Sequence, residues 1–123
     1  MVDDFGPFRQ LVRSILAAKS ELQIVGEAAD GLEAVQKAVE LKPDLILLDI
    51  GLPLLNGIEA AREIRKLVPR SKIIFLSQES SPEVVQEALG LSASSYVVKA
   101  TAGSELLTAV EAITLGRKDL GGN

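Results

Sequence analysis

Short runs of branched aliphatic residues alternate along the chain with longer stretches in which apolar residues recur every three or four positions. The runs at 44–49, 72–76 and 95–98 predict strands buried on both faces, and a partly alternating run at 22–28 predicts another. The periodic stretches predict helices over 8–19, from Asp30 to before Pro43, and over 58–67, 82–89 and 105–115. This alternation predicts a parallel sheet with helices on both faces, joined by right-handed crossovers.

Local signals set the expected helix ends. Pro7 suits the first turn of the first helix. Asp30 is expected to cap the second helix, with Glu33 as its capping-box partner. Gly116 is expected to stop the last helix, which leaves residues 117–123 as a frayed polar tail after a single domain over 1–116. The side chains expected to face the core are Phe8, Leu11, Val12, Ile15 and Leu16; Leu32, Val35, Ala38 and Val39; Ile58, Ala61, Ile64 and Leu67; and Leu106, Leu107, Val110 and Ile113.

Composition narrows the chemistry that is available. The 123 residues include no cysteine and no histidine, which excludes disulfides, thiolate or imidazole metal sites and a Ser-His-Asp triad. A net charge of −4 argues against nucleic-acid binding by this segment. No apolar run approaches the length of a membrane span, and the first residues lack a signal-peptide core. A cytoplasmic α/β domain that works through carboxylates, hydroxyls and cationic side chains is expected.

Polar side chains fall where the expected strands end. Asp3 and Asp4 follow the short start of the chain, Asp49 ends the run at 44–49, Ser77 follows the next strand and Lys99 follows the last. The carboxyl ends of parallel strands meet at one edge of the sheet. Clustered carboxylates are tolerated if Mg²⁺ binds among them. With a lysine and a hydroxyl opposite, the set favours metal-assisted phosphoryl transfer to an aspartate nucleophile.

Each of these residues also has a simpler interpretation. Asp3 and Asp4 alone would be read as a solvated chain end, Ser77 as a turn hydroxyl and Lys99 as a solvated lysine. Asp49 alone could cap the next helix, although that helix is expected to begin only at Ile58. The phosphoryl-transfer hypothesis therefore rests on the recurrence of suitable residues at successive strand ends.

These residues carry a family resemblance. The sequence resembles the receiver domains of bacterial two-component response regulators, and Ala100 after Lys99, where a proline is common, resembles the LuxR-type (NarL/FixJ) subfamily. The resemblance implies a flavodoxin-like fold with a five-stranded parallel sheet of order 2-1-3-4-5. The matching segments are Val2-Asp3-Asp4, Asp44 to Asp49 with Leu52-Pro53 and Asn56-Gly57, Ser77, and Tyr96-Val97-Val98-Lys99.

The resemblance also implies roles for the matching positions. Asp49 would accept the phosphoryl group from a sensor histidine kinase, and the chain would act mainly as a switch that takes part in its own phosphorylation and dephosphorylation. Asp4, Asp49 and the backbone carbonyl of Gly51 would hold Mg²⁺, and Asp3 would support the metal through water. Lys99 would pair with the phosphoryl group. Ser77 would move toward it, and Tyr96 would turn inward as an aromatic switch, re-shaping a surface that regulates transcription or forms a homodimer.

Two departures from the family pattern qualify these expectations. Only Met1 and Val2 precede the acidic pair, so the first strand is severely shortened. We expect a truncated or misassigned start, with partial closure of the gap by Met1 and Val2, or filling by another chain, as alternatives. We also expect the isolated chain to be poorly stable or self-associating. The second departure is that the LuxR-type subfamily usually carries a linker and a helix-turn-helix domain after the receiver, and we expect no basic recognition helix within these 123 residues.

Two other functions stay open. The first is a receiver-like protein-binding module that is not phosphorylated, because the short first strand could misplace Asp3 and Asp4. The second is a metal-dependent phosphatase on a similar sheet. Gly51 argues against the phosphatase, because it occupies the second position of the Asp-x-Asp motif which that class tends to use.

Overall fold

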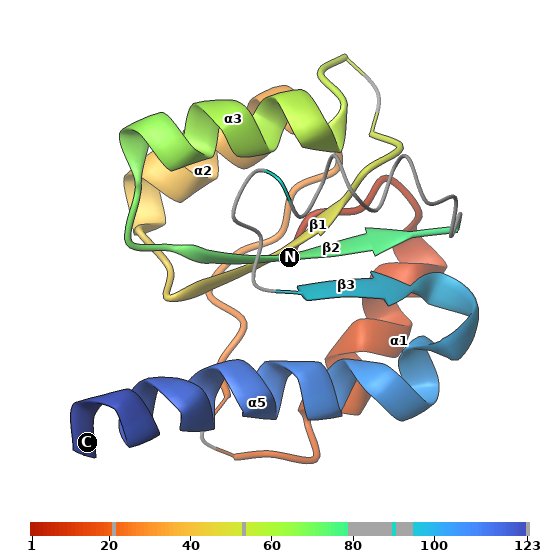
Figure 1. Ribbon diagram of the computed structural model, residues 1–123. Coiled ribbons are helices and arrows are strands. Elements are labelled where there is room, and N and C mark those ends of the chain that lie inside the picture. The colour runs from red at the N-terminus through yellow and green to blue at the C-terminus, as the bar shows by residue number, and fades with distance from the viewer. Residues whose placement is uncertain (21, 53, 79–89, 91–94, 123) are drawn as a thin grey trace.

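Strands and helices alternate in three layers. The computed structural model describes residues 1–20, 22–52, 54–78, 90 and 95–122, so the helix expected over 82–89 lies outside the described residues. Figure 1 shows the sheet between α2 and α3 on one face and α1 and α5 on the other. The elements in chain order are α1 (Gly6–Leu16), α2 (Gly31–Leu41), β1 (Leu45–Asp49), α3 (Gly57–Leu67), β2 (Lys72–Ser77), β3 (Ser95–Val98), the 3-10 turn η1 (Lys99–Thr101) and α5 (Ala102–Gly122).

The sheet is parallel, as the sequence predicts. The three strands lie in the order β1-β2-β3, with Ile46 opposite Ile73 and Phe75 opposite Tyr96. The central residues of β1 and β2 are buried. Helices cover both faces of the sheet, which is why these strands read as continuous aliphatic runs instead of alternating ones.

The first residues of the chain extend the sheet on the free side of β1. Val2 forms parallel bridges with both Ala28 and Leu48. Its amide donates to the Leu47 carbonyl at 2.7 Å, and its own carbonyl accepts from the Asp49 amide at 3.0 Å. Met1–Val2 therefore lie between the 22–28 segment and β1, so the backbone order agrees with the expected 2-1-3-4-5 arrangement.

The first two of the five expected strands are almost absent from the described sheet. The run at 22–28 was expected to be a strand, but of its residues only Ala28 takes part in a bridge. Within the described residues, the backbone on its sheet side pairs with it only at Met1–Asp3, and the rest of the segment has no paired strand there. A strand without a partner leaves its backbone groups unpaired and does not form a ladder.

The core has two parts, one on each face of the sheet. One part lies under α2 and α3 and contains Val2, Leu48 and Phe75. The other lies under α1 and α5 and contains Val12, Ile74 and Leu106. Val2 is 4% exposed, so the short N-terminal segment is anchored in the first part and delivers the acidic pair that follows it.

Side-chain caps begin two of the helices. The Asp30 carboxylate accepts from the Glu33 amide at 2.8 Å, and the Glu33 side chain accepts from the Ala29 amide at 2.8 Å, which confirms Asp30 as the cap of α2. The side chain of Asn56 caps α3 by accepting from the Glu59 amide at 3.0 Å. Asp49 therefore does not cap that helix, and its side chain remains available at the strand end.

Several expected core positions are wrong. Leu11, Leu32, Val39 and Leu67 are exposed, by 45%, 55%, 42% and 55%. In α2 the inward face consists of small residues instead, namely Gly31, Ala34 and Ala38. A Cβ atom at Gly31 would lie 1.7 Å from the Leu55 carbonyl oxygen. This close approach selects the small face of α2 and turns Leu32 and Val39 outward.

The last helix is longer than the sequence predicts. It begins at Ala102 and continues to Gly122, so Gly116 does not end it. A glycine inside a helix costs only about 1 kcal/mol relative to alanine, and no proline follows to break the helix.

Candidate functional site

The side chains singled out in the sequence lie at the carboxyl edge of the sheet. In Figure 1 the three strand arrows point toward the same edge. Asp49 is the last residue of β1, Ser77 is the last residue of β2, and Lys99 follows directly after β3. Asp3 and Asp4 follow Val2, which is bridged to β1 at Leu48. The structure therefore brings the residues from separate strands to one site.

Three carboxylates form the acidic part of this site. Oxygen atoms of Asp3, Asp4 and Asp49 all lie within 4.8 Å of one another. Asp3 is fully buried, Asp49 is 5% exposed, and Asp4 is exposed. The site thus has a buried floor and one carboxylate open to solvent.

Local hydrogen bonds fix the buried carboxylate. Oδ1 of Asp3 accepts from the Phe5 amide at 2.8 Å, which turns the chain sharply after the acidic pair. The Asp3 carbonyl accepts from the Arg9 guanidinium at 2.5 Å, and Arg9 also contacts Glu27 at 3.3 Å. Sequence reasoning missed this supporting role of Arg9, because it depends on how α1 folds back over the turn.

The ammonium of Lys99 balances the buried charge. Its Nζ lies 2.6 Å from Oδ2 of Asp3 and 3.3 Å from Oδ2 of Asp49. The same Nζ lies 4.7 Å from the centroid of the Phe8 ring, in a cation–π contact. The sequence indicates Phe8 only as a core residue of the first helix, and its contact with Lys99 appears only when α1 packs beside the strand ends.

Asp49 is electrostatically perturbed. Burial raises the pKa of its carboxyl above the ordinary value of 3.8, the neighbouring Lys99 ammonium acts against that rise, and the Asp3 carboxylate adds to it. The Gly51 amide also donates to Oδ1 of Asp49 at 3.2 Å, which favours the ionised form. A further cation near Asp49 would favour its ionised form as well.

The donor set fits a hard divalent cation. Mg²⁺ prefers oxygen ligands, and one or two carboxylates together with several waters commonly supply them. Oδ2 of Asp3 is buried without a hydrogen-bond partner among the described residues, and its polar contact is the ion pair with Lys99. The cluster therefore combines a buried carboxylate, Asp3, whose Oδ2 has no hydrogen-bond partner among the described residues, with an exposed carboxylate, Asp4. This combination suits a cation that keeps part of its hydration shell.

The remaining predicted residues lie around this cluster. Ser77 is buried and pairs with Val98 across β2 and β3. Tyr96 is half-buried and packs against the core on the α2 and α3 face. Gly51 is exposed and follows Asp49 by two residues. The roles expected of the Ser77 hydroxyl, the Tyr96 ring and the Gly51 carbonyl stay predictions.

Comparison with known proteins gives a consistent result. A family model described as response regulator receiver domain matches residues 1–111. The response regulator protein VraR of Staphylococcus aureus (strain Mu3 / ATCC 700698) is 37% identical over 115 residues, which cover 94% of this chain and 55% of VraR. The chain thus spans about half the length of the curated relatives that it matches.

Solved structures are similar over most of the chain. A LuxR-family two-component response regulator from Aurantimonas sp. SI85-9A1 is 34% identical, with a TM-score of 0.87 over 94% of this chain and 82% of that one. The receiver domain of a response regulator NarL, described as putative, from Mycobacterium tuberculosis is 29% identical, with a TM-score of 0.86 over 94% and 93%. The response regulator domain of Thermotoga maritima CheB is 36% identical, with a TM-score of 0.82 over 89% and 90%.

Proposed function

This chain belongs to the response regulator receiver domain family of two-component systems, and from that premise we propose that Asp49 accepts a phosphoryl group from a sensor histidine kinase. One observation carries the proposal. Asp49 ends a buried strand within 4.8 Å of two further carboxylates, and Lys99 reaches both Asp49 and Asp3. A nucleophile, a cationic side chain and ligands for a metal therefore share one site.

The metal part of the proposal assigns Mg²⁺ to the carboxylate cluster. Asp4, Asp49 and the carbonyl of Gly51 would hold the ion, and Asp3 would support it through water. When bound, Mg²⁺ supplies positive charge next to the oxygens of the phosphoryl group. The exposure of Asp4 and the burial of Asp3 suit these different roles.

The transfer step uses the side chain of Asp49 as the nucleophile. One of its oxygens attacks the phosphorus atom of a phosphohistidine, the P–N bond breaks, and the imidazole nitrogen leaves with the electron pair. The product is an aspartyl phosphate. Lys99, whose side chain is 12% exposed, holds its charge beside the acceptor in a largely water-excluded position, where it would offset the charge of the phosphoryl oxygens.

The output part of the proposal is a change of surface. Ser77 would donate its hydroxyl to a phosphoryl oxygen, and Tyr96 would turn further inward as the backbone after β2 follows Ser77. The altered face would regulate a transcriptional output in the cytoplasm, either directly or through a homodimer. The position of Ser77 at the end of β2, one residue beyond the partner of Asp49, supports its role as the sensor of the new group.

The test is phosphorylation by a small acyl phosphate, followed by intact mass. The wild-type chain should gain one phosphoryl group with Mg²⁺ and lose this reaction when EDTA replaces the metal. Asp49→Asn should gain none. Asp44→Asn is the matched control, because Asp44 directly precedes the same strand and is exposed.

Two results would contradict the proposal. Asp49→Asn could gain phosphate at the wild-type rate, which would place the acceptor elsewhere. Alternatively, the folded wild-type chain could gain none in Mg²⁺, which would favour a receiver-like protein-binding module that works without phosphorylation.

A further inference from the structure

A shallow cleft lies between α2 and the loop that joins β1 to α3, the two helices that pack together on one face of the sheet (Figure 1). Its volume is about 680 Å³, comparable to the pockets of about 300–1,000 Å³ that proteins use for binding. The first turns of α2, the loop and Glu63 of α3 line it. Neither Asp49 nor Lys99 lines the cleft, so it is separate from the carboxylate site.

The floor of this cleft is apolar and already formed. Val35 of α2 and Leu55 of the loop are partly buried and pack against the core beneath α2 and α3. A Cβ atom at Gly31 would lie 1.7 Å from the Leu55 carbonyl oxygen, so the backbones of helix and loop are in close contact. A partner would therefore find the floor in place, which lowers the entropic cost of binding.

Two exposed leucines form the rim of the cleft. Leu32 is 55% exposed and Leu54 is 79% exposed, and both line the cleft. Leu54 also has a φ of 67°, in the left-handed region where a residue other than glycine is strained. Such strain is often retained at functional sites. Here it holds an apolar side chain in water, and a partner that covered both leucines would remove their apolar surface from water.

The charged side chains that line the cleft are all acidic. Asp30, Glu33 and Glu63 line it, and no lysine or arginine of the described residues does so. The capping box holds two of these carboxylates in place, because Oδ1 of Asp30 accepts from the Glu33 amide and Oε1 of Glu33 accepts from the Ala29 amide. The cleft therefore combines an apolar floor with a negative rim.

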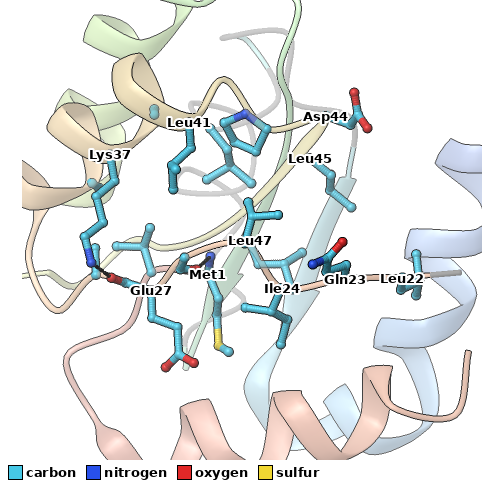
Figure 2. Close-up of a pocket in the computed structure, with 18 of the residues that line it drawn as sticks. Met1, Leu22, Gln23, Ile24, Glu27, Lys37, Leu41, Asp44, Leu45 and Leu47 are labelled. Atoms are coloured by element: carbon cyan, nitrogen blue, oxygen red, sulfur yellow. Dashed lines mark hydrogen bonds between the residues drawn. The ribbon is translucent and has the colours of Figure 1, made fainter. Parts of the chain in front are cut away.

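Two lysines adjoin the cleft and neutralise this rim only in part. Lys37 lies 3.9 Å from Glu33, but its ammonium also donates to the Glu27 carbonyl. Figure 2 shows this contact on the flank of α2 that faces the 22–28 segment. Lys66 lies 3.6 Å from Glu63 and is 72% exposed, so water screens that pair. A cationic partner would still gain from the carboxylates of the rim.

The shape and charge of the cleft select the occupant. Leu32 and Val35 lie one turn apart on α2, so they form a ridge that suits a second helix with apolar residues three and four positions apart. A helix of this kind binds a groove through its apolar face, and flanking cations would fit the acidic rim. A two-fold contact of the cleft with itself would set carboxylates against carboxylates, which disfavours a second copy of this chain.

From these features we propose that the cleft is a docking site for a basic amphipathic helix of another protein. The apolar stripe of that helix covers Leu32 and Leu54 and contacts the floor. Its lysine or arginine side chains lie beside Asp30, Glu33 and Glu63. The inference concerns a surface separate from Asp49 and does not depend on its phosphorylation.

The test uses the whole 123-residue chain and the synthetic peptide acetyl-Leu-Lys-Lys-Leu-Leu-Lys-Ala-Leu-Lys-Lys-Leu-Leu-Lys-Ala-amide, whose leucines recur at helical spacing. An NMR titration at physiological salt, which screens non-specific attraction, follows the backbone amides of the protein. The amides of Val35 and Leu55 should shift and reach saturation, because these residues form the floor. The absence of a saturable shift at both amides overturns the proposal.

Peptide variants separate docking from simple adhesion. Replacing every lysine by glutamate keeps the apolar stripe and reverses the charge, so this peptide should bind about tenfold more weakly or worse. A peptide of the same composition, with its leucines scrambled away from one face, should weaken by a similar factor. Equal binding of the glutamate peptide would overturn charge complementarity, and equal binding of the scrambled peptide would overturn docking of a helical face.

Paired protein variants test the location. Leu32→Lys should weaken binding of the lysine peptide by about tenfold or more, whereas Leu67→Lys should leave it unchanged, because Leu67 is equally exposed at 55% and lies outside the cleft. Glu63→Gln should weaken binding by about twofold to fivefold. Glu40→Gln is its control, since Glu40 is exposed on α2 outside the cleft. Equal effects within either pair would overturn the assigned location.

Leu54→Gly should act in opposite directions on stability and on binding. Glycine adopts a φ of 67° without strain, so the free chain should melt about 2–4 °C higher, while the peptide should bind about threefold more weakly or worse. Unchanged binding would remove Leu54 from the docking surface. Sedimentation of the free chain completes the test. A dimer whose formation shifts the Val35 and Leu55 amides would make a second copy the occupant, and the proposal would be wrong.

Discussion

Replacing Lys99 by methionine isolates the electrostatic role of the ammonium at the site. Methionine keeps most of the length and the apolar stem of lysine and removes its charge. In the wild-type chain that charge lies 2.6 Å from Asp3 and 3.3 Å from Asp49, and both carboxylates are almost inaccessible to solvent. Lys99→Met would therefore leave two neighbouring buried carboxylates without a counter-charge.

The expected loss is large. Breaking a buried ion pair by removing one partner typically costs about 3–5 kcal/mol. The Lys99 side chain is 12% exposed, so water can partly replace the ammonium. We therefore expect the free energy of unfolding to fall by about 3 kcal/mol, which corresponds to a fall in Tm of roughly 10 °C. The assay is urea unfolding at pH 7 in EDTA, repeated with Mg²⁺, which should recover part of the loss if the carboxylates hold the ion.

The pH dependence of this stability loss and a control variant provide two further tests of the role of Lys99. Burial raises the pKa of Asp49, so Asp49 becomes protonated as the pH falls, and the difference between wild type and Lys99→Met should shrink. Lys66→Met is the control, because Lys66 is 72% exposed and contacts Glu63 at 3.6 Å on the surface of α3. It should cost less than about 0.5 kcal/mol. A Lys99→Met variant as stable as this control in EDTA would refute the assigned role of Lys99.

Three further substitutions test other parts of the site and fold. Asp49→Asn should raise the Tm at pH 7, because burial raises the pKa of Asp49 and makes its charged form costly in the folded chain. This gain in Tm should shrink as the pH falls toward the ordinary aspartate pKa of 3.8, because wild-type Asp49 then becomes protonated. Phe8→Leu keeps an apolar side chain and removes the ring beneath Lys99, so phosphorylation by an acyl phosphate should slow by about twofold to fivefold, and an unchanged rate would count against a positioning role. Gly31→Ala should destabilise the fold by about 3 kcal/mol or more in urea unfolding, since the added Cβ would meet the Leu55 carbonyl oxygen at 1.7 Å; a loss below 1 kcal/mol would mean that α2 can shift away.

The position of the site could be predicted because it depends on local sequence patterns. A buried aliphatic run that ends in Asp49, followed two strands later by Lys99, identifies the edge of a parallel sheet without knowledge of the packing. The Asp30 cap was predictable for the same reason, because the bonds of a capping box join residues three or four positions apart. Expectations of this kind depend on neighbours in sequence, and most of them hold.

Features that depend on packing between distant segments were not predictable. The choice between Leu32 and Ala34 as the inward side of α2 depends on how closely that helix approaches Leu55, which hydrophobic periodicity does not encode. The contact of Phe8 with Lys99 joins residues at opposite ends of the chain. The 22–28 run has the composition of a strand, but a strand also needs a paired neighbour, and within the described part of the chain only Ala28 of this run takes part in a bridge.

Mapping the phosphorylated residue tests the central claim most directly. After reaction with an acyl phosphate in Mg²⁺, borohydride reduces an aspartyl phosphate to homoserine, and the altered residue can be located by peptide mass spectrometry. We predict conversion at Asp49 alone, with none at Asp3 or Asp4. Homoserine at Asp3 or Asp4, or a borohydride-resistant phosphate on Ser77, would contradict the account.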